Sequence, residues 1–232
     1  MDLVQLFLFI LLIQYGVGET TGENDTKSLI ESYENNLNTS IALGKNDRVL
    51  VDTWTVEFQV KRVNITTKYR LQMTRHKEHN FKPADYNLKW GGCVDLHRKE
   101  IRRSERNYYN HETDCLKSVS ALDSDKRRSV DQVEKEIRKW RKSYRYLVNL
   151  CDINNLNDKE GAQNCLVEYM ERDKFSQVIE RLVIIKLEVM GDLYLHYTTS
   201  LTNLDECLKK QLSRYLDRVR AIMDVLNKCY DL

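Results

Sequence analysis

The sequence predicts a mostly α-helical protein, an antiparallel four-helix bundle stapled by disulfides and preceded by an N-terminal extension. Only one of its 232 residues is proline and eight are glycine, so few residues would break a helix. Charged residues make up 31% of the chain and nearly cancel, which is typical of a water-exposed helical surface. Cysteine spacing is the third observation. Cys93 and Cys115 are 22 residues apart, and so are Cys207 and Cys229, which places each pair on one face of a helix.

Residues 1–18 are predicted to form a signal peptide. The apolar run from Leu3 to Ile13 is shorter than the roughly 20 residues of a membrane span, and small residues follow at Gly16 and Gly18. No Lys or Arg precedes this run, which departs from the usual pattern. No later stretch resembles a membrane span, so the mature chain is expected to be secreted and extracellular. In that compartment an even number of cysteines indicates disulfides rather than metal ligands.

Residues 19–92 are predicted to be an N-terminal glycosylated extension. Three Asn-x-Ser/Thr sequons, at Asn24, Asn38 and Asn64, predict N-linked glycans, in agreement with secretion. Apolar residues at steps of four predict a short amphipathic helix from Lys27, which is expected to end at Gly44.

Residues 54–73 fit two structures. Apolar and polar residues alternate from Trp54 to Val60, and β-branched and aromatic residues are frequent, as in a β-hairpin. Leu50, Trp54 and Phe58 also fall at steps of four, as in a helix. The sequence therefore leaves a short hairpin and a helix open as alternatives.

The six-cysteine helical domain is predicted to span residues 93–232. The single proline, Pro83, and the pair Gly91-Gly92 mark its start. Four helices are expected, of which the second is the clearest because its apolar residues recur at alternating steps of three and four. This seam consists of Val130, Val133, Ile137, Trp140, Tyr144, Leu147 and Cys151.

The third and fourth helices are predicted to be separated by polar residues. The third gives way to Thr198-Thr199-Ser200, and the fourth opens with a capping-box pattern, Asn203 followed by Glu206. If the four helices alternate in direction, the first and fourth are antiparallel neighbours, and a turn joins the second to the third. The predicted disulfides are then Cys93–Cys229, Cys115–Cys207 and Cys151–Cys165.

No specific catalytic pattern occurs in the sequence, which contains no Gly-x-Ser-x-Gly, His-Glu-x-x-His or Cys-x-x-Cys. His76 and His79 could offer two metal ligands, but no third or fourth ligand accompanies them at a suitable spacing. His111 and Asp114 lie beside Cys115, which cannot be a thiolate nucleophile while it forms a disulfide. We therefore expect a non-enzymatic protein without a catalytic, cofactor or metal site.

Basic residues gather on two predicted helices. From Arg98 to Arg145 there are 15 Lys or Arg against 9 Asp or Glu. A basic face there would attract heparan-type glycans, another anionic surface or an acidic extracellular macromolecule, although an ordinary solvated surface fits the same charges. Nucleic acid is not expected as a partner of a secreted chain. The predicted basic face consists of Arg98, Lys99, Arg102, Arg103, Arg138, Lys139, Arg141 and Lys142.

Tyrosine is frequent, with 13 residues in the chain. Tyrosines on the helical seams could line a partly wet interior that admits a small apolar ligand, or they could simply pack in the core. A carrier of a small hydrophobic ligand is therefore the alternative function. The seam tyrosines are Tyr108, Tyr144, Tyr169, Tyr194 and Tyr215.

Two cysteine-bearing segments, Asn164-Cys165-Leu166-Val167-Glu168 and Glu206-Cys207-Leu208-Lys209, closed by Cys229, carry a resemblance to a known family. With the signal peptide and the scarcity of proline, they resemble small insect secreted proteins that have a TsetseEP-type domain. The resemblance covers about 60% of the chain. It implies a non-enzymatic binding protein of the insect gut or body fluid with a role in defence; salivary proteins that act on a host are a second association.

Overall fold

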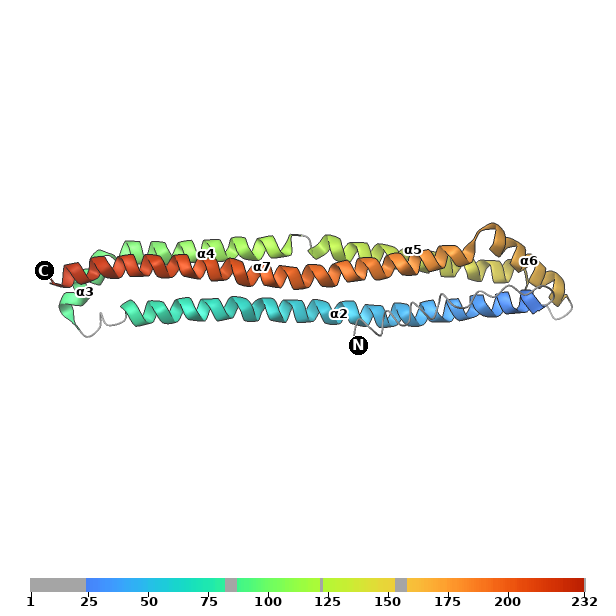
Figure 1. Ribbon diagram of the computed structural model, residues 1–232, viewed down its shortest axis with the longest axis horizontal. Coiled ribbons are helices and arrows are strands. Elements are labelled where there is room, and N and C mark those ends of the chain that lie inside the picture. The colour runs from blue at the N-terminus through green and yellow to red at the C-terminus, as the bar shows by residue number, and fades with distance from the viewer. Residues whose placement is uncertain (1–23, 82–86, 122, 153–157, 232) are drawn as a thin grey trace. The chain divides into compact units, whose positions relative to one another are not determined.

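The computed structural model describes residues 24–81, 87–121, 123–152 and 158–231, which are largely helical and contain no strand. The mostly α-helical class predicted from the sequence is therefore confirmed. The predicted signal peptide and Pro83 lie outside the described residues. In chain order the helices are α2 (Asn24–Phe81), α3 (Leu88–Leu96), α4 (Arg98–Ser120), α5 (Asp123–Leu150), α6 (Lys159–Arg172) and α7 (Phe175–Asp231) (Figure 1).

The chain forms two compact units. Unit 1 combines the chain up to Gly44 with Lys135–Val183, and unit 2 combines Lys45–Glu134 with Ile184–Leu232. Unit 2 runs across the boundary that the sequence placed after residue 92. The segment of α2 from Lys45 to Phe81 contributes Phe58, Tyr69, Met73 and Phe81 to the hydrophobic core of unit 2.

The hairpin alternative for residues 54–73 is wrong, because this stretch lies within α2. The exposed fractions of the side chains show why the helical period prevails. Phe58 is 1% exposed, whereas Val56 and Val60, which alternate with polar residues, are 62% and 52% exposed. A strand would bury Val56 and Val60 on the same face as Phe58. The predicted end of the first helix at Gly44 is also wrong, since α2 continues through it.

The predicted break near residues 198–200 does not occur, because α7 runs from Phe175 to Asp231 without interruption. Hydroxyl groups there bond within the helix instead of ending it. Thr198 donates to the carbonyl of Leu195 at 2.9 Å, and Thr202 donates to the carbonyl of Thr198 at 3.2 Å. Such back-bonding is the usual way in which Thr is accommodated inside a helix. The third and fourth predicted helices are therefore partly fused.

Gly191 lies inside α7, where a Cβ atom would meet no heavy atom within 4 Å. Gly191→Ala is therefore expected to raise the free energy of unfolding by about 0.5–1 kcal/mol, because alanine loses less backbone entropy in a helix. Chemical unfolding would measure the gain. Gly161→Ala is the control, since its Cβ would press against the Asp158 carboxylate that accepts the Gly161 N–H at 2.9 Å. An equal gain in both variants would contradict this account.

Two disulfides join α4 and its neighbour α3 to α7 within unit 2, as predicted. Cys93 bonds to Cys229 and Cys115 bonds to Cys207, each with a Cα–Cα distance of 6.0 Å. Because the cysteine numbers rise from α3 to α4 while those of their partners fall along α7, α3 and α4 run antiparallel to α7. The apolar side chains that α4 and α7 bury between these bridges are Ile101, Tyr108, Leu208, Leu212, Tyr215, Val219, Ile222 and Leu226.

Unit 1 contains the third predicted disulfide, Cys151–Cys165, which joins the end of α5 to α6. The core of unit 1 is packed around Trp140 of α5. The indole Nε1 donates to the carbonyl of Phe175 at 3.0 Å, and the Trp140 and Phe175 rings lie 6.0 Å apart. Tyr144 stacks on Tyr33 of α2 with ring centroids 5.9 Å apart, and burial raises the pKa of Tyr144 to about 12. The heptad seam predicted for this helix is therefore a packed core.

Candidate functional site

The first basic segment lies at the start of α4, in unit 2. Arg98, Lys99, Arg102 and Arg103 are exposed there. Arg98 is bound to Asp95, whereas Arg102 and Arg103 lie in the next turn. The carboxylate of Glu105 is bound at 3.0 Å by Lys77 of α2, so another helix offsets one of the nearby negative charges. The surface of this segment therefore stays basic.

The second basic segment belongs to α5 in unit 1, and its members differ in their surroundings. Arg138 and Lys142 are exposed, and Lys139 donates to Glu136 at 2.7 Å. Arg141 is half-buried, and its Nε donates to the Ser40 hydroxyl of α2 at 3.0 Å. Arg141 thus also ties α5 to α2. Because the two segments lie in different units, a single basic face made from both stays a prediction.

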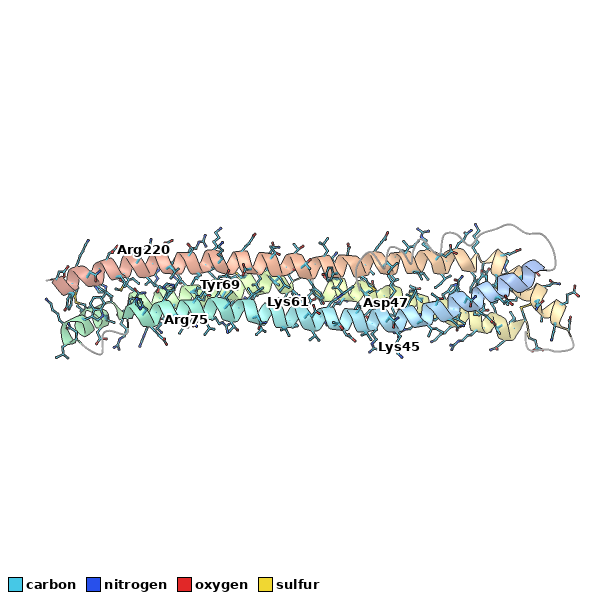
Figure 2. All side chains as sticks on the ribbon, turned by 60° about the horizontal axis from the view of Figure 1, so that its bottom comes forward. Lys45, Asp47, Lys61, Tyr69, Arg75 and Arg220 are labelled. Atoms are coloured by element: carbon cyan, nitrogen blue, oxygen red, sulfur yellow. A yellow bond between two sulfur atoms is a disulfide. The ribbon has the colours of Figure 1, made fainter. Side chains whose placement is uncertain are left out.

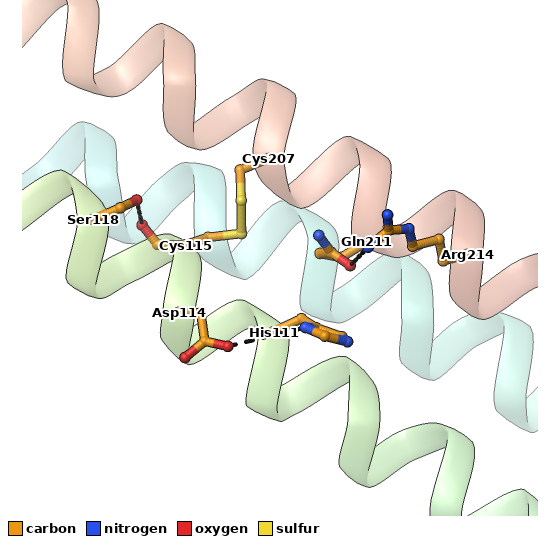
Figure 3. Close-up of a disulfide and its surroundings, with 7 residues drawn as sticks. All are labelled: His111, Asp114, Cys115, Ser118, Cys207, Gln211 and Arg214. Atoms are coloured by element: carbon orange, nitrogen blue, oxygen red, sulfur yellow. Dashed lines mark hydrogen bonds and ion pairs between the residues drawn. A yellow bond between two sulfur atoms is a disulfide. The ribbon is translucent and has the colours of Figure 1, made fainter.

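A pocket of about 100 Å³ lies between α4 and α7 in unit 2. It lies next to the Cys115–Cys207 bridge, where Figure 3 shows His111 of α4 near Gln211 and Arg214 of α7. Its volume falls well below the roughly 300–1,000 Å³ of sites that enclose drug-sized ligands, so it does not support the apolar carrier. The lining residues are Ser104, Tyr108, His111, Gln211, Arg214, Tyr215 and Arg218.

Two tyrosine hydroxyls at this pocket are buried without a hydrogen-bond partner among the described residues, those of Tyr108 and Tyr215. Each side chain is 2% exposed, and the two rings meet edge to face at 5.8 Å. Burial raises the pKa of both hydroxyls well above the ordinary value, so both stay protonated and can donate. Leaving such a group unpaired costs about 1–3 kcal/mol, which calls for an acceptor that the protein itself does not supply.

Hydrogen-bond donors and cations dominate the lining. Arg214 and Arg218 are exposed at the pocket, and Arg214 donates to the Gln211 amide oxygen at 3.3 Å, which leaves the amide nitrogen of Gln211 as a further donor. Ser104 donates to the carbonyl of Ile101 at 2.8 Å. No carboxylate is among the lining residues, although the charges of Glu112 and Glu105 lie near enough to add to the raised pKa of the Tyr108 and Tyr215 hydroxyls. Asp114 lies 4.0 Å from His111 (Figure 3). Arg214 and Arg218 nevertheless give the lining an excess of positive charge, which suits an anion.

Two buried ion pairs near the core of unit 2 have structural roles. Glu112, 2% exposed, accepts from Arg70 of α2 at 2.9 and 3.0 Å. Lys186 of α7 is 7% exposed and lies 2.7 Å from Asp47 of α2 and 2.8 Å from Glu134 of α5. Figure 2 labels Asp47 on α2. No residue pattern in the sequence predicts the two carboxylate partners of Lys186.

The predicted glycosylation sites and the candidate metal-ligand histidines whose side chains the structure describes are exposed on α2. Asn38 and Asn64 are exposed on α2, where a glycan would find room, and the side chain of Asn24 lies outside the described residues. His76 and His79 are exposed, and no group of three possible metal ligands occurs in the part of the chain that the structure describes. Cys115 forms a disulfide. None of the described helices has a stretch that is both long and apolar enough to cross a membrane.

The seam tyrosines are only partly in the core. Tyr108, Tyr144 and Tyr215 are buried, Tyr169 is half-buried and Tyr194 is 43% exposed. Sequence reasoning did not find Arg214 and Arg218, because their place at the pocket depends on the register between two helices. That register could have been read from the equal cysteine spacing.

Comparison with known proteins identifies no relative: no protein family, curated protein or solved structure matches the chain. The resemblance to TsetseEP-type secreted proteins therefore stays a prediction.

Proposed function

We propose that the protein is a secreted, glycosylated and non-enzymatic binding protein that engages an anionic extracellular macromolecule. The basic residues at the start of α4 carry this proposal, since Arg98, Lys99, Arg102 and Arg103 are all exposed. Cations in the first turn of a helix oppose its dipole by about 0.3–1 kcal/mol each, so helix stability does not explain the basic residues that open α4. An anionic partner would make use of these exposed cations.

Disulfides support both the compartment and the mode of binding. Three bridges fit an oxidising environment such as the extracellular space. The basic segment lies between two bridges, of which Cys93–Cys229 ties α3 to α7 and Cys115–Cys207 ties α4 to α7. A rigid array of charges loses less conformational entropy on binding than a flexible one. A defence or host-interaction role in an insect, as the family resemblance implies, belongs to this proposal.

Arg102→Gln combined with Arg103→Gln is expected to weaken binding to heparin about fivefold. This corresponds to about 1 kcal/mol for two exposed cations, each worth roughly 0.5 kcal/mol. Affinity of the unchanged protein should also fall as salt is raised, because screening shortens the reach of exposed charges. Surface plasmon resonance on immobilised heparin at several salt concentrations measures both effects.

The matched control removes two positive charges from α2, by Arg48→Gln combined with Lys61→Gln; both residues are exposed, and Figure 2 labels Lys61. Near-unchanged binding is expected for this control. An equal loss in both variants would mean that net charge alone attracts heparin. Absence of salt-dependent binding by the unchanged protein would contradict the proposal.

A further inference from the structure

The pocket between α4 and α7 is held open by covalent bonds. Cys115–Cys207 lies beside it (Figure 3), and Cys93–Cys229 joins α3, the helix before α4, to the far part of α7. Tyr108 and Arg214 are each seven residues from the nearer bridge, on opposite helices, so they face each other across the pair. The groups that line the pocket are therefore positioned before any ligand arrives.

The polar groups at the pocket require an occupant rich in acceptors. The hydroxyls of Tyr108 and Tyr215 are donors without partners among the described residues, and the guanidinium groups of Arg214 and Arg218 can only donate. A phenylalanine at either tyrosine position would fill the same space without leaving an unpaired hydroxyl. An anion in the pocket would offer acceptors to donors from both helices.

Size narrows the class of anion. A volume of about 100 Å³ is well below that of sites for drug-sized ligands, roughly 300–1,000 Å³, and therefore favours a small anion. A tetrahedral oxyanion offers oxygens in several directions, toward donors on both helices, whereas a carboxylate offers two oxygens in one plane.

We propose that this pocket binds a single tetrahedral oxyanion, a sulfate or phosphate group, through Tyr108, Tyr215, Arg214 and Arg218. The site is distinct from Arg102 and Arg103, and it needs no macromolecule, because the free inorganic anion already carries the chemistry that the pocket recognises. If the anionic partner proposed above is a sulfated glycan, one of its sulfate groups would occupy the pocket.

The test titrates the full chain, without the predicted signal peptide, with sodium sulfate against sodium chloride at matched ionic strength. Thermal unfolding reports binding because a ligand of the folded state raises Tm, and NMR of labelled arginine side chains locates it. Sulfate should raise Tm saturably and more than chloride, and the signals of Arg214 and Arg218 should shift. Parallel titrations with phosphate and acetate distinguish the two oxyanions from each other and from a carboxylate.

Tyr215→Phe and Arg218→Gln are each expected to weaken sulfate binding about tenfold, the usual effect of losing a hydrogen bond to a charged group. Without sulfate, Tyr215→Phe should keep or raise Tm, which separates ligand binding from a folding defect. The controls are Tyr197→Phe, whose hydroxyl already bonds to Thr55 at 3.1 Å, and Arg220→Gln, which lies on α7 but does not line the pocket (Figure 2).

Three results would overturn the proposal: equal effects of sulfate and chloride, unchanged sulfate affinity in Tyr215→Phe and Arg218→Gln, or stronger binding of acetate than of both oxyanions. Heparin binding tests the proposed function, binding of an anionic macromolecule, separately from the oxyanion pocket. If the Arg102 and Arg103 variant lost heparin binding but still bound sulfate, the proposal that the pocket binds an oxyanion would be supported.

Discussion

Removing the Cys115–Cys207 bridge is expected to lower the free energy of unfolding by about 4 kcal/mol. In the chain-entropy account a crosslink stabilises a protein by restricting its unfolded state, and the effect grows with the loop that is closed. While Cys93–Cys229 is intact, the second bridge closes a loop of about 45 residues, made of the two stretches that separate the bridges. Alanine is the suitable replacement, since Cys115 is 2% exposed and a serine would bury a hydroxyl.

The matched comparison removes Cys151–Cys165, whose cysteines are 14 residues apart. The shorter loop predicts a smaller decrease in the free energy of unfolding, about 3 kcal/mol. Guanidinium unfolding of both double-alanine variants under non-reducing conditions, followed by circular dichroism, would rank them. A loss below about 1 kcal/mol on removal of Cys115–Cys207, or the reverse order of the two variants, would show that this bridge does not clamp the helices.

Cysteine pairing could be predicted from the sequence because it rests on local geometry. Equal spacing along two helices leaves one antiparallel arrangement in which both pairs meet, and a short connection between Cys151 and Cys165 leaves little freedom for the third. The helical class could likewise be predicted, from the composition of the chain. Neither the cysteine pairing nor the helical class depends on how a third helix packs.

Helix boundaries were harder to predict because the same residues satisfy two patterns. Val56, Phe58 and Val60 alternate with polar residues as in a strand, yet only Phe58 is buried, against the core that α4 and α7 form. Contacts with residues distant in the sequence therefore favour the helix over the strand, as tertiary contacts commonly override local β-propensity. At Thr198 a local hydrogen bond to Leu195 kept α7 continuous, which no residue pattern distinguishes from a loop.

The pocket could be predicted only in part. Tyr108 and Tyr215 were singled out from the sequence as seam residues, either lining a partly wet interior for a small apolar ligand or packing in the core. Arg214 and Arg218 make the lining cationic, and they reach it only because α4 and α7 are locked in one register. Residue spacing on a single helix cannot show which side chains of a second helix lie opposite.

Lys186→Met is expected to lower the free energy of unfolding by about 3–5 kcal/mol. Lys186 lies 2.7 Å from Asp47 and 2.8 Å from Glu134, and side-chain exposures of 7%, 12% and 16% leave all three largely out of water. Removing the ammonium takes away the cation that the two largely buried carboxylates share, so their mutual repulsion is no longer offset by it. Urea unfolding measures the loss, and Lys209→Met, at an exposed position of α7, should change stability by less than about 0.5 kcal/mol.

Asp47→Leu and Glu134→Leu combined with Lys186→Met are expected to recover most of this loss. Replacing a whole buried ion cluster by apolar residues removes the desolvation penalty along with the attraction, so the net change is small or even stabilising. A single-variant loss with recovery in the triple variant would show that the lysine is needed because the carboxylates are there. A loss below about 1 kcal/mol for Lys186→Met alone would mean that water or another cation reaches the two carboxylates, and that this cluster does not hold α2, α5 and α7 in register within unit 2.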